Sequence, residues 1–126
     1  MFPLDIEVWE RFLDRHGDSY IGFAYDVKVG EKCKVHKHWG ENYKRDAEVL
    51  SKLRIDVVGV KDEALDIIEV KPTAKASAIG QMLTYHHCFL HDFDTSKEVR
   101  TMIVAEHFDP NIIPILGANN IAYVKV

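Results

Sequence analysis

The sequence has 126 residues, 47% of them hydrophobic, and a formal net charge of -4 at pH 7. This length and composition predict one compact domain over residues 1–126. The chain lacks the roughly 20 consecutive apolar residues that a membrane-spanning helix requires. Asp5, Glu7 and Glu10 interrupt the apolar stretch at the N-terminus, unlike a secretory signal peptide, so we expect a soluble protein of the cytoplasm.

The chain contains two cysteines, Cys33 and Cys88, which are far apart in the sequence. The absence of a Cys-x-x-Cys pair argues against a disulfide framework, an iron-sulfur cluster and a four-cysteine zinc site. A zinc site remains an alternative because of two mixed groups, although neither has the spacing of a familiar closed zinc site. These groups are Cys33, His36 and His38, and His86, His87 and Cys88.

The charges are distributed unevenly along the chain. Residues 28–54 contain eight basic and four acidic side chains, so this segment is net positive and the remainder is net negative. Such a basic segment can face the phosphates of a nucleic acid, and an exposed charged surface without a ligand is the alternative. The residues that we expect to bind nucleic acid are Lys32, Lys34, Lys37, Lys44, Arg45 and Arg54.

The first predicted elements are a helix and a strand. Apolar residues recur at spacings of three and four over residues 4–16, which predicts an amphipathic helix that ends at Gly17. Residues 20–29 are rich in β-branched and aromatic side chains, which predicts a strand that Gly30 closes.

A loop and a second helix are predicted next. Residues 31–40 are polar and basic without a clear period, as in a loop. Tyr43, Ala47, Leu50 and Leu53 then fall on one helical face.

Two strand-forming runs follow, over residues 54–61 and 64–71. Asp62 and Glu63 separate them, and this connection is short enough for an antiparallel hairpin. Pro72 is expected to end the second strand.

The segment that ends at Phe93 is predicted to be a helix of about five turns. Gln81 and Tyr85 share one face of this helix, away from its apolar stripe. The stripe, which an amphipathic helix turns toward the core, contains Ile79, Met82, Leu83, His86, Phe89, Leu90 and Phe93.

A strand over residues 99–105, a short helix over 111–116 closed by Gly117, and a strand over 121–126 complete the chain. The long helix must connect the hairpin to a parallel strand by a right-handed crossover. The sequence therefore predicts an α/β fold with a mixed central β-sheet flanked by helices.

Three polar residues of the hairpin are candidates for chemistry. If the hairpin turns symmetrically, Asp56 lies directly opposite Glu69, and the two-residue period of a strand places Lys71 on the same face. Two carboxylates at this distance repel each other unless a cation lies between them. Oxygen ligands at an open site suit Mg²⁺ or Mn²⁺, and the backbone carbonyl of Val70 is a candidate third ligand.

These residues form a recognisable pattern. Asp56 and Glu69-Val70-Lys71 on a hairpin resemble the motif of the PD-(D/E)XK nuclease superfamily, although Ile55 stands where many members have proline. The segment from Gln81 to Tyr85 resembles the QxxxY motif of the RecB-like branch of that superfamily. The resemblance covers residues 20–126 and implies a restriction-endonuclease-like core of order αβββαβ.

The resemblance implies a nuclease that depends on Mg²⁺ or Mn²⁺. It implies catalytic roles for the residues of both motifs, and many members use a further acid from the first helix, for which Glu10 is the candidate metal ligand and Glu7 the second choice. The alternative is that each motif is an ordinary polar strand face or helix edge. The implied catalytic residues are Asp56, Glu69, Lys71, Gln81 and Tyr85.

The expected function is hydrolysis of the phosphodiester bonds of DNA by a metal-activated water. Two alternatives are an RNA endonuclease with the same site and an inactive nucleic-acid-binding or assembly module of the same fold. The short chain favours structure-selective, single-strand or end-directed cleavage, by a homodimer or as part of a larger complex.

Overall fold

The computed structural model describes residues 1–31 and 53–126. Five strands form one sheet in the order β1-β2-β3-β4-β5. The strand β2 is antiparallel to β1 and to β3, whereas β4 is parallel to β3 and β5 is parallel to β4. The strands are β1 (Gly22–Lys28), β2 (Arg54–Val60), β3 (Ala64–Ala74), β4 (Glu98–Phe108) and β5 (Ile121–Lys125).

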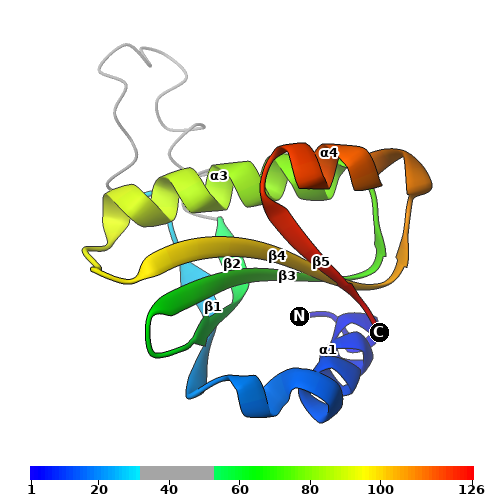
Figure 1. Ribbon diagram of the computed structural model, residues 1–126, viewed down its shortest axis with the longest axis horizontal. Coiled ribbons are helices and arrows are strands. Elements are labelled where there is room, and N and C mark those ends of the chain that lie inside the picture. Colours follow the sequence, from blue (N-terminus) through cyan, green and yellow to red (C-terminus); the bar gives the residue numbers. More distant parts are fainter. Residues whose placement is uncertain (32–52) are drawn as a thin grey trace.

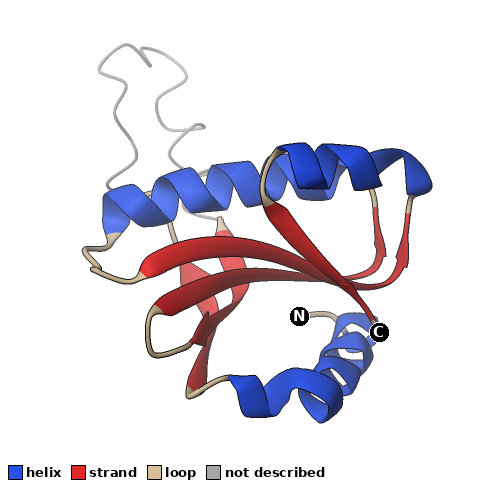
Figure 2. Cartoon of the chain, in the orientation of Figure 1, coloured by secondary structure: helices blue, strands red, loops and turns tan. Residues whose placement is uncertain are grey.

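Helices cover both faces of the sheet. The helix α1 (Pro3–His16) lies on one face, while α3 (Ala76–Asp92) and α4 (Ile113–Ala118) lie on the other (Figure 1, Figure 2). Short 3₁₀ helices, η1 (Gly17–Ser19) and η3 (Pro110–Ile112), precede β1 and α4. The predicted mixed α/β fold and its element order are confirmed. The helix predicted around Tyr43 lies outside the described residues.

An aromatic cluster holds α1 on the sheet. Val8, Trp9 and Phe12 are buried against the same core as Val57 and Ile68. The Trp9 ring also stands edge-on to Phe23 of β1 at a centroid distance of 5.2 Å. These contacts fix α1 against β1, β2 and β3, because aromatic rings contribute the largest buried areas of any side chains.

The helix α3 is rotated relative to the orientation predicted from its sequence. Its buried residues are Ala78, Met82, Tyr85, Cys88 and Phe89. In contrast, Leu83 and Leu90 of the predicted core stripe are 48% and 50% exposed, and Phe93 just beyond the helix is also exposed. The prediction of the buried stripe was therefore wrong for these three residues.

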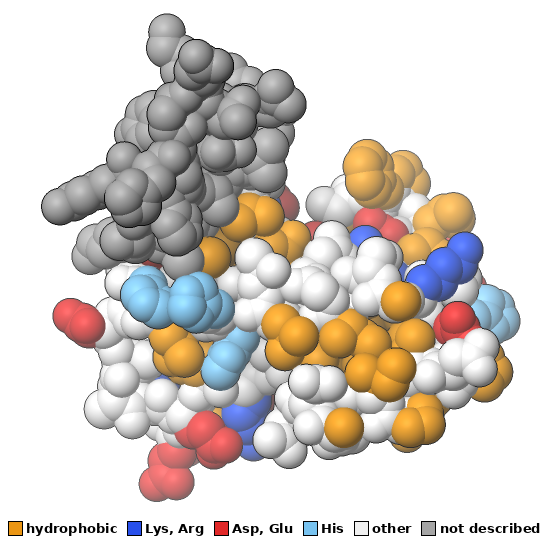
Figure 3. All heavy atoms as spheres, turned by 90° about the horizontal axis from the view of Figure 1, so that it is seen from above, with side chains coloured by type: hydrophobic (Ala, Val, Ile, Leu, Met, Phe, Trp, Pro, Cys, Tyr) orange, Lys and Arg blue, Asp and Glu red, His pale blue; other side chains and the backbone are white. Residues whose placement is uncertain are grey.

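The exposed side chains add to an apolar surface. Figure 3 looks onto α3 and α4 and shows hydrophobic side chains gathered on this face. The exposed large apolar residues near it include Leu83, Leu90 and Ile115. Among the described residues, no helix is long and apolar enough to cross a bilayer.

Two predicted element ends were also wrong. Pro72 does not end β3, which continues to Ala74. A proline is tolerated there because β3 pairs with β4 alone beyond Ile68, so the N–H that proline lacks is not needed for pairing with β2. Gly117 does not end α4, which runs to Ala118, and Asn120 adopts the positive φ of 55° that follows the helix.

Candidate active site

The hairpin of β2 and β3 has the predicted register. Val57 pairs with Ile68 and Val58 with Ile67, and the Lys61 N–H donates to the Ala64 carbonyl oxygen at 2.9 Å across the turn. One step beyond the pair of Val57 and Ile68, the same register sets Asp56 opposite Glu69. Alternation along β3 puts Glu69 on the same face as Ile67, whose side chain packs with residues of α3. The two acidic residues therefore lie on the α3 face of the sheet.

Asp56 and Glu69 each contact a residue of β3. The Val70 N–H donates to Asp56 Oδ2 at 3.0 Å. The Lys71 Nζ lies 3.5 Å from Glu69 Oε1. Glu69 Oε2 is buried and has no hydrogen-bond partner among the described residues. One oxygen of this carboxylate is thus left without compensation.

Burial and mutual repulsion act on both carboxylates. Burial, followed by the nearby Asp56 carboxylate, raises the pKa of Glu69 to about 8 despite the opposing effect of Lys71. Burial also raises the pKa of Asp56, while the Val70 N–H opposes this shift. A free acid pair in this position would therefore hold a proton near neutral pH.

The helix α3 contributes two further side chains to the same place. Tyr85 is buried, and burial together with the charges of Glu69 and Asp56 raises its pKa to about 12. Gln81 lies one turn earlier on α3, forms a side-chain hydrogen bond with Tyr85, and has a buried Oε1 without a partner among the described residues. The rotation of α3 thus brings the Gln81 and Tyr85 face toward the two carboxylates.

The groups that could hold a divalent cation are the Asp56 and Glu69 carboxylates and the Val70 carbonyl. A strand residue points its N–H and C=O to the same edge, so the carbonyl of Val70 is directed to the same side as its N–H, toward Asp56. Within residues 1–31 and 53–126, no group of three or more His, Cys, Asp or Glu side chains is arranged to hold a metal ion. A cation here would complete its shell with water or substrate oxygens.

The structure does not place Glu10 in this site. Glu10 is exposed on α1, on the side away from the buried Trp9 and Phe12. Asp5 is the α1 acid whose charge acts on Asp56, where it raises the pKa. The sequence pattern could have indicated that Asp5 faces the sheet. Asp5 lies three residues before Val8 and four before Trp9, which are buried, so it shares their face of the helix.

The expected nucleic-acid-binding residues are mostly outside the described part of the chain. Arg54 is exposed at the start of β2, where it pairs in register with Lys28 of β1. The other five predicted contacts cannot be placed because they lie within residues 32–52, which is also the position of Cys33, His36 and His38.

The second group considered for zinc does not converge. His86 Nε2 lies 3.2 Å from the Val99 carbonyl oxygen, while Cys88 is buried in the core. His87 is exposed and its ring lies against that of His91, at a centroid distance of 4.3 Å. The three side chains of this group therefore point in different directions.

The sequence reasoning missed a second cluster of charged groups around Asp66. This side chain is 3% exposed and contacts Tyr20, Lys61 and Arg100. The signal was available, because Asp66 interrupts an apolar strand just as Glu69 does. Its partners, however, lie in other elements and form no local motif.

Comparison with known proteins gives a structural likeness. No family model matches the chain, and no curated protein matches it. The crystal structure of a repair endonuclease from Pyrococcus abyssi superposes with a TM-score of 0.55 and 15% sequence identity, over 97% of this chain and 46% of that chain. The chain thus spans about half the length of that protein. At this level of identity the likeness establishes a shared fold: the mixed sheet flanked by helices is an arrangement found in a repair endonuclease.

Proposed function

We propose that the chain is a metal-dependent nuclease that hydrolyses phosphodiester bonds of DNA, with the site of the PD-(D/E)XK superfamily and the QxxxY motif of its RecB-like branch. The observation that carries this proposal is the buried Glu69 carboxylate, which lies opposite a second carboxylate and has one oxygen without a hydrogen-bond partner in the described part of the chain. Such a pair is costly unless a cation neutralises it.

The donor set fits Mg²⁺ or Mn²⁺. Both ions prefer oxygen ligands and keep several waters, and Asp56, Glu69 and the Val70 carbonyl supply oxygen only. When bound, such an ion would lower the pKa of the attacking water and offset the charge that develops on the phosphate. The fold that the chain shares with a repair endonuclease supports this assignment.

Each protein group has a distinct role in the proposed reaction. Lys71 lies beside Glu69 on β3, where its ammonium can orient the water and donate to a phosphate oxygen. Tyr85 is protonated at neutral pH, like any tyrosine, and burial raises its pKa further, so its hydroxyl can donate a hydrogen bond toward the carboxylates. Gln81 positions that hydroxyl from the preceding turn of α3.

We propose DNA as the substrate, and the experiment also tests RNA. Purified protein is incubated with labelled single-stranded, duplex and branched DNA and with RNA, in Mg²⁺, in Mn²⁺ or in chelator. We expect cleavage of a DNA substrate in either metal and none in chelator. Glu69→Gln and Lys71→Met should reduce the rate by at least about a hundredfold, because each removes a group from the reacting centre.

Matched control variants separate chemistry from general surface effects. Glu63→Gln and Lys125→Met change an exposed acid and an exposed lysine outside the site, and both should cleave at the wild-type rate. Equal cleavage by Glu69→Gln and wild type would refute the site. Metal-independent retention of DNA on a gel without turnover in any metal would instead establish a binding module.

A further inference from the structure

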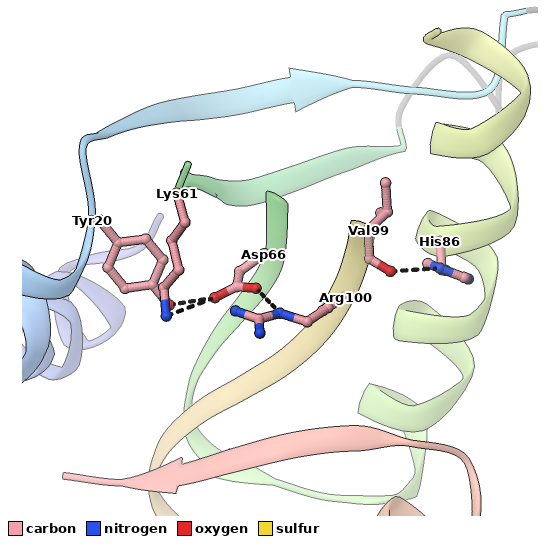
Figure 4. Close-up of polar contacts among 6 residues, drawn as sticks. All are labelled: Tyr20, Lys61, Asp66, His86, Val99 and Arg100. Atoms are coloured by element: carbon pink, nitrogen blue, oxygen red, sulfur yellow. Dashed lines mark hydrogen bonds and ion pairs between the residues drawn. The ribbon is translucent and has the colours of Figure 1, made fainter. Parts of the chain in front are cut away.

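The cluster around Asp66 lies on the other face of the sheet from the candidate active site. Figure 4 shows Asp66 between Tyr20 and Lys61 on one side and Arg100 on the other. The Tyr20 hydroxyl donates to Asp66 Oδ2 at 2.6 Å, and the Arg100 Nε–H donates to Oδ1 at 2.8 Å. The Lys61 Nζ lies 4.0 Å from Oδ2. Asp66 is thus a buried anchor for two cationic side chains.

The anchor leaves cationic donors free for a ligand. The Arg100 hydrogen bond uses the Nε–H, one of five N–H donors of a guanidinium, and the side chain remains 42% exposed. The Lys61 ammonium is 4.7 Å from the centre of the Tyr20 ring, which holds it beside Asp66. Because the contacts with Asp66 and Tyr20 already restrain the two side chains, Arg100 and Lys61 can bind an anion with little further loss of side-chain entropy.

A cavity of about 760 Å³ borders this cluster. It lies where the edge of β4 is uncovered, since β5 pairs with β4 from Thr101 onward and the first residues of β4, Glu98 to Arg100, precede that pairing. Its volume is within the range of small-molecule sites, about 300–1,000 Å³. The lining includes apolar (Phe12, Met102, Val124), charged (Lys61, Arg100, Glu98) and amide (Asn119, Asn120) groups, and Leu83 and His86 of α3 also border the cavity.

We propose that this cavity binds a nucleoside monophosphate unit, either as a free nucleotide or as one nucleotide of a nucleic-acid strand. The phosphate would lie on Arg100 and Lys61, since guanidinium and ammonium groups are the usual partners of phosphate. The base would lie on the apolar side chains of Phe12, Met102 and Val124, with the asparagine amides at its polar edge.

The mixed charge of the lining favours a nucleotide over a simple anion. Glu98 lines the cavity beside Arg100, and its charge acts on the guanidinium. A carboxylate would repel a bare phosphate ion, but it accepts hydrogen bonds from ribose hydroxyls or base amino groups. A ligand that carries a phosphate, hydroxyls and a flat ring with polar edges thus matches the cationic, acidic, amide and apolar groups of the lining.

The test measures binding of mononucleotides in chelator, so that the proposed catalytic metal plays no part. AMP, UMP, adenosine and inorganic phosphate are titrated into ¹⁵N-labelled protein and followed by NMR chemical shifts. We expect saturable shifts with a mononucleotide, and binding weaker by about tenfold or more for adenosine and for phosphate alone, since each lacks one set of contacts. Glu69→Gln should bind as wild type does, because Glu69 is on the opposite face.

Two variants and one control locate the site. Arg100→Gln should weaken binding by about tenfold or more, the value of a charge-assisted hydrogen bond. Ala122→Trp adds a ring at the exposed β5 position that lines the cavity and should abolish binding while it leaves the Asp66 cluster intact. Arg15→Gln alters an exposed arginine of α1 outside the cavity and should bind as wild type does.

A competition experiment then distinguishes the two sources of the nucleotide. Displacement of the mononucleotide by a single-stranded oligonucleotide would assign the cavity to a nucleic-acid strand, and failure to displace it would assign the cavity to a free nucleotide. Absence of saturable binding by every mononucleotide up to about 10 mM would overturn the proposal, since that concentration corresponds to less than 3 kcal/mol of binding free energy. Unchanged binding by folded Ala122→Trp and Arg100→Gln would overturn it as well. Neither result bears on cleavage at Glu69.

Discussion

A β-carbon added to Gly59 would lie 2.5 Å from Cε1 of Tyr20 and 2.7 Å from its Cδ1. Gly59 is therefore the residue of β2 that allows the Tyr20 ring to approach the strand this closely. From that position the Tyr20 hydroxyl reaches Asp66. The requirement for glycine here is steric, because a side chain would force the ring away from its partner.

Gly59→Ala should destabilise the protein by about 1–3 kcal/mol, the usual cost of inserting a methyl group into a packed core. Gly80→Ala is the matched control: a β-carbon at this exposed position of α3 meets nothing within 4 Å. That substitution should stabilise the protein by about 0.5–1 kcal/mol, because alanine favours the helix over glycine. Chemical denaturation measures both free energies, and equal effects of the two variants would contradict the packing of Tyr20.

Met82→Ala and Leu90→Ala test the rotation of α3. Met82 is fully buried, so its truncation should cost about 2–5 kcal/mol. Leu90 is half exposed, and its truncation should cost less than about 1 kcal/mol. Denaturation midpoints and slopes of the two variants provide the comparison. An effect at Leu90 as large as that at Met82 would mean that Leu90 faces the core, as its sequence pattern predicts, and would contradict its exposure in the structure.

This helix shows where prediction from sequence fails. Leu83 and Leu90 are more hydrophobic than Tyr85, so local pattern favoured the wrong face. The choice depends on the sheet beneath α3, where Tyr85 meets polar groups of β2 and β3 that lie 16 or more residues earlier in the chain. The hairpin register was predictable because a two-residue turn and strict alternation are local properties.

The stability of the metal-free protein should fall as the pH rises. The pKa of Glu69 is about 8 in the folded protein and has an ordinary value of 4.5 in the unfolded chain, so between these pH values the folded state holds a proton that the unfolded chain has lost. The contribution of this proton is complete below about pH 4.5 and is lost as the pH rises through about 8. Unfolding free energies in chelator at several pH values across this window measure the slope.

Glu69→Gln isolates that contribution. The variant cannot ionise at this position, so its unfolding free energy should depend less steeply on pH than that of wild type over the same window. Glu63→Gln, in the exposed hairpin turn, should keep the wild-type slope. Added Mg²⁺ or Mn²⁺ should stabilise wild type at pH 8 and have little effect on Glu69→Gln. Identical slopes for all three proteins would contradict a raised pKa at Glu69.

Tyr85→Phe should slow cleavage by about 10- to 100-fold, the usual effect of losing a group that orients metal ligands. The ring and its burial are retained, so the unfolding free energy should change by about 1 kcal/mol. Steady-state kinetics should show the loss in kcat with little change in KM. Tyr123→Phe, which alters an exposed tyrosine of β5, is the control. An unchanged kcat in Tyr85→Phe would remove this hydroxyl from the mechanism.

The candidate active site and the cluster around Asp66 differ in how far the sequence alone predicts them. Asp56, Glu69 and Lys71 lie on one hairpin, so spacing and turn length were sufficient to bring them together. The Asp66 contacts join residues 46 and 34 positions apart, to Tyr20 and Arg100. Sequence pattern marked Asp66 as an anomalous charge, but only the tertiary arrangement of β3, β4 and the segment between η1 and β1 identifies these two partners.

The backbone of β1 at Asp26 affects how another chain can associate with the edge of the sheet. Asp26 has a φ of 53°, and the pairing of β1 with β2 passes from Tyr25 to Val27 without it. This left-handed residue interrupts the outer edge of the sheet in the middle of its strand. Another chain can therefore pair with only short stretches of that edge, and we expect this to disfavour edge-to-edge association through β1.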